Sequence, residues 1–441
     1  MKRITIFLLA VFFAVGLPMT AQESTQKADE KKKADSYGRT PDRYVPFGKF
    51  TKPYKQFFLD PLEYHGYGRQ IPEPEQVESV KIGFLGPIEP TVSVATGGLS
   101  HEESLGRKML QGAKLAIEQA NVRGGYRDRK IPYQLVVRND NGLWGASGNE
   151  IIHLAYKDNV WAILGTIDGA NSHIAIRVAL KVEISMMNTG DTDPTFTETA
   201  IPWVFRVITD DRQMCYLLAD FVFKKLKLTR VAALRANNRY GRMSIDEFRD
   251  AATRSGHPFL VELNYPVGDT DFTSQLQRIK SLNPEVVITY GNAAESALIL
   301  KQMRAMGMNQ WFIGSDRMVS PEFIKNAGEN IGKVAAGYPY NPESGDPRYL
   351  EFKRLFKKRF GETPETYAAH AYDGMCMLIK AIEKGGLNRA RIRDELAKMK
   401  HYDGVTGKKE FDPVFNNISP AALAVLENSR WVFYSQEEAL K

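Results

Sequence analysis

The stretch Trp161–Thr197, WAILGTIDGANSHIAIRVALKVEISMMNTGDTDPTFT, decides the fold of this chain. It contains one pattern twice, a short apolar run that ends in a polar loop. The first run, Trp161–Leu164, leads into the loop Gly165–Ser172, and the second, Ile184–Met187, leads into the loop Asn188–Pro194. A helix-forming segment separates the two. Short apolar runs that alternate with helices are typical of a parallel α/β sheet.

The two polar loops predict a binding crevice. In a parallel sheet, loops at the carboxyl ends of neighbouring strands face one crevice, and ligands collect there. Both loops are rich in Gly, Ser, Thr, Asn and Asp, which offer backbone N–H groups and hydroxyls to a ligand carboxylate. Either loop alone is better explained as an ordinary αβ turn. Two such loops in succession favour a crevice for a small molecule.

The same alternation extends along the chain as two series of similar length, so we predict two doubly wound, Rossmann-like α/β lobes with a ligand cleft between them. We assign residues 80–208 plus 338–372 to lobe one and residues 209–337 plus 373–441 to lobe two. The tail is expected to form three helices and a hairpin, at Pro347–Phe360, Thr366–Lys384, about Ala390–Met399, and Ala421–Glu427 with Arg430–Tyr434.

The composition sets limits on the class of protein. A chain of 441 residues can form two domains, and 43% hydrophobic with 25% charged residues is a soluble globular composition. The net charge of +7 is spread thinly, and no basic stripe with interleaved aromatic residues occurs. Nucleic-acid binding is therefore not expected.

The first 21 residues predict a secretory signal. Lys2 and Arg3 form the positive region, Ile4–Leu17 is the apolar stretch, and we place cleavage after Ala21. Fourteen apolar residues are too few to cross a bilayer, and no later run is long enough. We expect an exported protein that is not embedded in the membrane.

Residues 22–79 separate the signal from the folded body. Residues 22 to about 36 are polar and charged, which predicts disorder. Tyr37–Ser79 is dense in aromatic, Pro and Gly residues without a steady period. Such a segment cannot build its own core, yet its aromatic side chains are costly to leave in water. This arm either packs on the body or docks a partner.

No pattern of catalysis or cofactor binding stands out. The chain lacks a nucleophile elbow, a complete phosphate loop and a set of Cys or His residues with metal-ligand spacing. The seven histidines are scattered. We therefore predict a protein that is not an enzyme and needs no cofactor. Cys215 and Cys376 could form a disulfide after export, but two buried free thiols are favoured.

Several segments together resemble the periplasmic leucine/isoleucine/valine-binding proteins, which are type 1 periplasmic solute-binding proteins of ABC importers. The resemblance covers about Val80–Tyr434. Its motifs are Val80–Pro87, GAKLAIEQANVRGG at Gly112–Gly125, NTGDTDPTFT at Asn188–Thr197, FRVITDD at Phe205–Asp211, NRYGR at Asn238–Arg242, DFTSQLQRIKSLNPEVVITYG at Asp271–Gly291 and KEFDP at Lys409–Pro413. It implies two lobes joined by three crossings, a periplasmic location, and delivery of a solute to a membrane ABC permease.

The resemblance also implies a set of ligand-binding residues. In amino-acid binders the first loop holds the ligand carboxylate, and its positions here are Gly169, Ala170 and Ser172. The second loop contributes Gly190 and Thr192. Lobe two contributes Tyr240, Asn292 at a position that is usually aromatic, and Asp316 as the acid that pairs with a ligand ammonium. Leu105 stands at another position that is usually aromatic.

A zwitterionic ligand needs donors at one end and a buried acid at the other, which Thr192 and Asp316 would supply. Asp316 has an alternative explanation as the N-cap of a helix that begins at Pro321. The expected protein is a monomeric solute-binding component that closes by hinge motion. The alternative is a periplasmic sensory or assembly protein that uses the same lobes as a ligand switch, which the arm at 37–79 favours.

Overall fold

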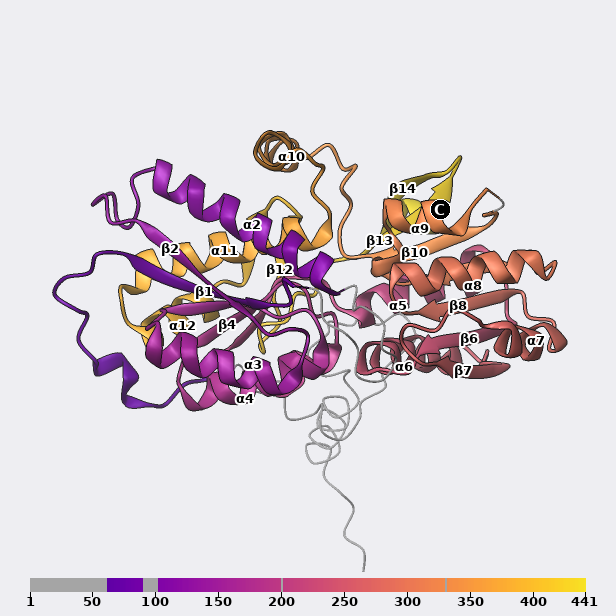
Figure 1. Ribbon diagram of the computed structural model, residues 1–441, viewed down its shortest axis with the longest axis horizontal. Coiled ribbons are helices and arrows are strands. Elements are labelled where there is room, and N and C mark those ends of the chain that lie inside the picture. The colour runs from indigo at the N-terminus through magenta and orange to yellow at the C-terminus, as the bar shows by residue number, and fades with distance from the viewer. Residues whose placement is uncertain (1–61, 90–101, 200, 330) are drawn as a thin grey trace, which may run out of the picture.

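The computed structural model of the chain describes residues 62–89, 102–199, 201–329 and 331–441. Two α/β lobes lie side by side, each built on its own sheet, and the chain passes between them more than once (Figure 1). The signal segment and residues 22–61 lie outside the described residues, so the expectations for them stay predictions.

Lobe one is a five-stranded parallel sheet in the order β2-β1-β3-β4-β5. Its strands are β1 Val80–Gly86, β2 Tyr133–Asn139, β3 Ala162–Gly165, β4 Ser185–Asn188 and β5 Val204–Arg206, and its first three helices are α2 Glu102–Val122, α3 Trp144–Ile152 and α4 Gly169–Lys181. The strand order reverses between β1 and β3, which places the end of β3 at a switch point where ligands collect.

Lobe two is a seven-stranded mixed sheet in the order β14-β13-β10-β9-β8-β6-β7. Its strands are β6 Val231–Ala236, β7 Val261–Tyr265, β8 Val286–Tyr290, β9 Trp311–Gly314, β10 Val334–Tyr338, β13 Ala422–Glu427 and β14 Arg430–Ser435. Its helices are α5 Asp211–Asp220, α6 Arg239–Arg254, α7 Thr273–Ser281, α8 Ala293–Ala305, α9 Pro321–Ala327 and α13 Gln436–Leu440. The last two strands run antiparallel and form the expected hairpin at the edge.

The segment of the chain between β10 and β13 forms α10 Pro347–Phe360, α11 Thr366–Gly385, α12 Arg389–Ala397 and the small hairpin β11 His401–Gly404 with β12 Gly407–Glu410. The three helices agree with the predicted ranges. The predicted lobe boundary at residue 373 is wrong, because it falls inside α11, whose later residues Met375 and Leu378 share the core of lobe one with Phe84.

The close packing of α11 on α2 places α11 in lobe one. A Cβ atom at Gly112 of α2 would lie 2.0 Å from the Ala368 carbonyl oxygen of α11, so only glycine allows the two helices to approach this closely. Residues 373 to about 417 therefore belong to lobe one, and only the final segment from β13 onward returns to lobe two.

Three crossings join the lobes, as the resemblance implied, and they are hydrogen-bonded to one another. Thr209 Oγ1 of the first crossing donates to the Pro339 carbonyl of the second at 2.9 Å. Asn417 Nδ2 of the third donates to the Val207 carbonyl of the first at 2.7 Å. The three crossings are thus bonded to one another in the region between the lobes.

The described part of the arm, residues 62–79, packs on lobe one. Arg69 binds both carboxylate oxygens of Asp394 in α12, at 2.5 and 2.9 Å. Asn388 Nδ2 donates to the carbonyl oxygens of Gly68 and Ile71 at 2.9 and 2.7 Å. These contacts support the packing interpretation for 62–79, whereas residues 37–61 lie outside the described residues.

Among the described residues, no helix combines the length and the apolar character needed to cross a membrane. Cys215 and Cys376 are free thiols, the first buried and the second half-buried, as the sequence favoured.

Asn388→Ala should lower the free energy of unfolding by about 2–4 kcal/mol. The change removes the N-cap of α12, whose side chain accepts from the Arg391 N–H, together with the two bonds that hold the arm. Chemical denaturation of the purified protein measures it. Lys384→Ala, at an exposed position of α11, is the control and should change stability by less than about 0.5 kcal/mol. Equal stability of both variants would contradict the role of Asn388.

Candidate ligand site

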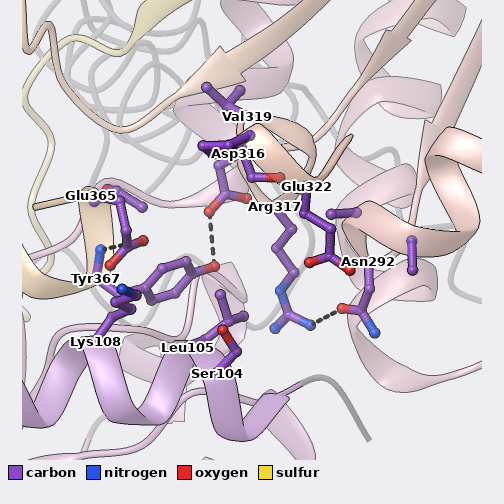
Figure 2. A pocket seen from close by; sticks show the side chains of 15 residues that line it. Ser104, Leu105, Lys108, Asn292, Asp316, Arg317, Val319, Glu322, Glu365 and Tyr367 are labelled. Atoms are coloured by element: carbon purple, nitrogen blue, oxygen red, sulfur yellow. Dashed lines mark hydrogen bonds between the residues drawn. The ribbon is translucent and has the colours of Figure 1, made fainter. Parts of the chain in front are cut away.

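A cavity of about 200 Å³ lies between the two lobes. Lobe one lines it with the first turns of α2 and α11, and lobe two with the start of α8 and the segment after β9 (Figure 2). The lining residues are Ser104, Leu105, Lys108, Glu365, Thr366 and Tyr367 from lobe one, and Asn292, Ala293, Ala294, Asp316, Arg317, Val319, Ser320, Pro321 and Glu322 from lobe two. Because both lobes contribute, a change in their relative position opens or closes this cavity.

Asp316 is the buried acid of the cavity, and tyrosines from both lobes hold its carboxylate. Tyr240 Oη donates to Oδ1 at 3.1 Å, and Tyr367 Oη donates to Oδ2 at 3.0 Å. Burial raises the pKa of Asp316, while Arg317 and the two hydroxyls oppose that rise. A cationic ligand group beside Asp316 would favour its ionised form further.

Arg317 follows Asp316 and also faces the cavity. Its Nη1 donates to Asn292 Oδ1 at 3.0 Å, and its guanidinium carbon lies 3.7 Å from the centre of the Tyr240 ring. The cavity therefore has a cation and an acid next to each other on lobe two (Figure 2).

Glu365 and Lys108 supply charge from lobe one. The Glu365 carboxylate caps α11 by accepting from the N–H groups of Tyr367 and Ala368, at 3.2 and 3.0 Å. Burial raises the pKa of Glu365 to about 7, although these two N–H groups lower it. Lys108 also lines the cavity and pairs with Glu362.

Three of the eight residues predicted for the site come together here. Asn292 and Asp316 line the cavity, and Tyr240 lies directly behind them as a partner of both Asp316 and Arg317. The N-cap explanation of Asp316 is wrong, because Ser320 caps α9 by accepting from the Phe323 N–H at 3.1 Å.

The five residues predicted on lobe one are absent from the described lining of this cavity and lie at the ends of β3 and β4. Asp168 caps α4 by accepting from the Ala170 N–H at 2.9 Å, and Ser172 Oγ donates to the Asp168 carbonyl at 3.0 Å. The Gly190 N–H is bound by Asn188 Oδ1 at 3.2 Å. The Ala170 and Gly190 N–H groups and the Ser172 hydroxyl are thus used within lobe one.

Thr192 and Gly169 face lobe two but meet protein groups there. Thr192 Oγ1 donates to Asp211 Oδ2 at 3.0 Å, an oxygen that also accepts from Ser244 at 2.6 Å. Burial, and secondarily the charge of Asp316, raise the pKa of Asp211 well above its usual range. A Cβ at Gly169 would lie 3.1 Å from Arg239 Nε of lobe two and 2.8 Å from an Asp193 carboxylate oxygen of lobe one.

The sequence interpretation missed Lys108, Arg317, Glu365 and Tyr367. Two of them carried a local signal: Lys108 is one helical turn beyond Leu105, and Arg317 directly follows Asp316. Glu365 and Tyr367 lie in a distant tail helix, and only the packing of α11 on α2 brings them to the cavity.

A second group of contacts joins the lobes beside Gly169. Arg239, at the start of α6, binds an Asp193 carboxylate oxygen at 2.8 Å and the Thr195 hydroxyl at 2.8 Å. The same guanidinium lies 3.0 Å from His173 Nε2, and burial lowers the pKa of His173. These contacts hold the β3 and β4 loops of lobe one against α6 of lobe two.

A sequence profile described as "Periplasmic binding protein" matches residues 79–429, which is most of the chain. The chain belongs to this family of periplasmic binding proteins. It is therefore a solute-binding protein and not an enzyme. It is 25% identical over 327 residues to an amino acid binding protein of Pseudomonas aeruginosa, which covers 73% of this chain and 85% of that protein.

Solved structures of other binding proteins share the fold. One is the branched-chain amino acid transporter substrate-binding protein LivJ of Streptococcus pneumoniae in complex with isoleucine, with a TM-score of 0.71, 21% identity, and coverage of 81% of this chain and 99% of that chain. Another is a solute-binding protein of R. palustris in complex with benzoate, with a TM-score of 0.71, 16% identity, and coverage of 81% and 96%.

Arg239→Ala should shift this binding protein toward an open arrangement of its lobes. The change removes an ion pair and a charge-assisted hydrogen bond between the lobes, which together are worth about 1–2 kcal/mol in a partly exposed position. Small-angle X-ray scattering of the ligand-free protein should then give a larger radius of gyration. Arg242→Ala, exposed on the same helix, is the control. Identical scattering of both variants and the wild type would show that the contact does not hold the lobes.

Proposed function

We propose that this protein is the solute-binding component of an ABC importer, and that it captures a small polar ligand, an amino acid or a related carboxylate or amide, by hinge closure. The observation that supports this proposal is the cavity between the lobes. Lys108 and Tyr367 line it from one side, and Asn292, Asp316 and Arg317 line it from the other. A ligand that contacts both walls stabilises the closed arrangement, because only that arrangement makes both sets of contacts.

The similarity to known binding proteins supports this ligand class. Relatives and structural neighbours include an amino acid binding protein, an isoleucine complex and a benzoate complex. Isoleucine and benzoate are both small and both carry a carboxylate. A cavity of about 200 Å³ that contains an acid and a cation fits a small ligand of this kind better than a large or fully apolar one.

The remaining parts of the proposal follow from the family. The mature protein would act as a periplasmic monomer after removal of the signal segment, and it would deliver its ligand to a membrane ABC permease. Reconstitution with the permease and ATPase encoded nearest to its gene tests this partnership. Ligand-dependent stimulation of ATP hydrolysis is expected, and the lack of any stimulation would contradict it.

A sensory or assembly role is the second candidate, and the arm is the observation that favours it. Residues 62–78 precede the region matched by the family profile, and they are held on α12 by Arg69 and Asn388. A transport component has no evident need for this addition. Failure to stimulate any importer, together with capture of a specific periplasmic protein that is lost on deletion of residues 22–78, would favour the second candidate.

Ligand binding should make the protein more compact. A thermal-shift screen with amino acids, small carboxylates, amides and aromatic acids identifies a ligand, and scattering is then recorded with and without saturating ligand. The radius of gyration should fall, because closure brings the lobes together around the three crossings. A value that does not change on saturation would indicate a rigid site instead.

Asp316→Ala should weaken binding of an amino acid more strongly than Thr192→Ala. Loss of Asp316 leaves a buried ligand ammonium without its acid, which costs on the order of 2–5 kcal/mol. The Thr192 hydroxyl is bound to Asp211, so its loss acts on the ligand indirectly and should cost about 1 kcal/mol. Calorimetry measures both. If Asp316→Ala binds the ligand as tightly as the wild type, the ligand has no ammonium at this position.

A further inference from the structure

A histidine takes part in the contact between α4 of lobe one and α6 of lobe two. His173 lies one helical turn after Gly169, the first residue of α4, so the two residues are on the same face of that helix. A Cβ at Gly169 would lie 3.1 Å from Arg239 Nε, so the absence of a side chain there lets the guanidinium of Arg239 lie against α4. Arg239 Nη2 is then 3.0 Å from Nε2 of His173, whose side chain is 19% exposed.

The hydrogen bonds of Arg239 determine which form of the His173 ring fits. A guanidinium has donors and no acceptor, so Nη2 must donate to His173 Nε2. The second hydrogen on Nη2 is donated to Thr195 Oγ1 at 2.8 Å. The Thr195 hydroxyl donates to Asp193 Oδ1 at 2.6 Å, and Arg239 Nε donates to Asp193 Oδ2 at 2.8 Å. Every donor then has an acceptor only if Nε2 is unprotonated, so the ring is neutral and carries its hydrogen on Nδ1.

A proton on Nε2 would disrupt this set of contacts. Two positively charged donors would then face each other at 3.0 Å. The protonated ring has other acceptors within reach, because Thr195 Oγ1 lies 2.9 Å and Asp193 Oδ2 lies 3.7 Å from Nε2. Both acceptors follow β4 and belong to lobe one, as does His173. Protonation thus exchanges a contact between the lobes for a contact within lobe one.

The surroundings of His173 in this arrangement disfavour its positive charge. Burial has the largest effect and lowers the pKa of His173. Three guanidinium groups lower it further, those of Arg239 in α6, Arg177 in α4 and Arg206 in β5. Asp193 opposes them and raises it. The helix α3 also packs on α4, and Gly148 meets apolar side chains there.

We propose that His173 is a pH-sensitive switch between the lobes. While its ring is neutral, Nε2 accepts from Arg239 and the lobes stay together. When the ring is protonated, it takes Asp193 and Thr195 from Arg239 and the lobes separate. Acidification therefore opens the cavity and weakens ligand affinity. This inference rests on the hinge closure of the proposed function and adds a regulation to it.

The direction of the pH effect follows from the two states of the ring. After separation, Arg239 no longer faces the ring, so the pKa of His173 returns toward its ordinary value of about 6.5. Because this pKa is lower in the closed arrangement, closure is fully favoured above the ordinary value and loses stability as the pH falls through it. One proton is taken up on opening, so the ratio of closed to open protein falls by at most about 10-fold per pH unit.

Two measurements on the full mature protein test the switch. NMR of protein with ¹⁵N-labelled histidine should show His173 as the neutral tautomer with its hydrogen on Nδ1 at about pH 7.5, and loss of the signal in His173→Gln assigns it. Small-angle X-ray scattering of the ligand-free protein should give a larger radius of gyration at about pH 5.5 than at about pH 7.5. The value at the lower pH should approach that of Arg239→Ala at the higher pH.

Two variants show whether the response belongs to this histidine. His173→Gln should not respond to pH, because its amide oxygen can accept from Arg239 and does not titrate. His153→Gln is the matched control, since His153 directly follows α3 in the same lobe and its side chain is 47% exposed. This control should keep the response of the wild type. Thermal unfolding at both pH values confirms that each variant is folded.

The outcomes separate this inference from the proposed function. The switch is wrong if His173 carries its hydrogen on Nε2 at about pH 7.5, if acidification leaves the scattering of the wild type unchanged, or if folded His173→Gln keeps the full response. The solute-binding function stands in each of these cases, because binding of isoleucine, benzoate or another probe of the thermal-shift panel decides it separately. A protein that binds no probe yet opens through His173 would support the switch and contradict the proposed ligand class.

Discussion

The buried guanidinium of Arg206 is the contact on which the two-lobed arrangement depends. It is fully buried at the end of β5, where Nη2 donates to Asp210 Oδ2 at 3.1 Å and Nε donates to Asn416 Oδ1 at 2.8 Å. Asp210 also caps α5, the first helix of lobe two, by accepting from the Gln213 N–H at 3.0 Å. An ion pair in the interior is stable only when its remaining donors and acceptors are satisfied, and these bonds meet that condition.

This network joins segments that are far apart in the sequence. Arg206 belongs to the first crossing, and Asn416 leads into the third, which Asn417 then bonds to Val207. A further guanidinium N–H reaches the Asp193 carbonyl in the loop after β4. The position of the β4 loop is therefore coupled to the crossings, so rotation of the lobes about the crossings and rearrangement of this loop are expected to occur together.

Polar groups between the lobes are of two kinds, those that bind one another and those that line the cavity. On one side, Arg239 binds Asp193 and Thr195, and Thr192 binds Asp211, so protein groups satisfy each other. On the other side, a cavity remains in which Asp316, Arg317 and Asn292 are buried and fixed by neighbours. A polar group held in a low-dielectric cavity interacts more strongly with a ligand than the same group in water, because competing solvent is excluded. The second side is thus the better place for selective binding.

The sequence by itself determined the two doubly wound lobes and the tail helices, because apolar periodicity and turn residues are local properties of the chain. Its motifs also resemble those of the binding-protein family to which the chain belongs. The family resemblance of the sequence named Asn292 and Asp316 as site residues, and both line the cavity. Only the tertiary structure decided that α11 belongs to lobe one, because that depends on the approach of two helices at Gly112 and Ala368. Likewise, only the tertiary structure shows that Thr192 binds Asp211 and that Arg317 lines the cavity. A side chain binds whichever partner the packing of distant segments brings within reach.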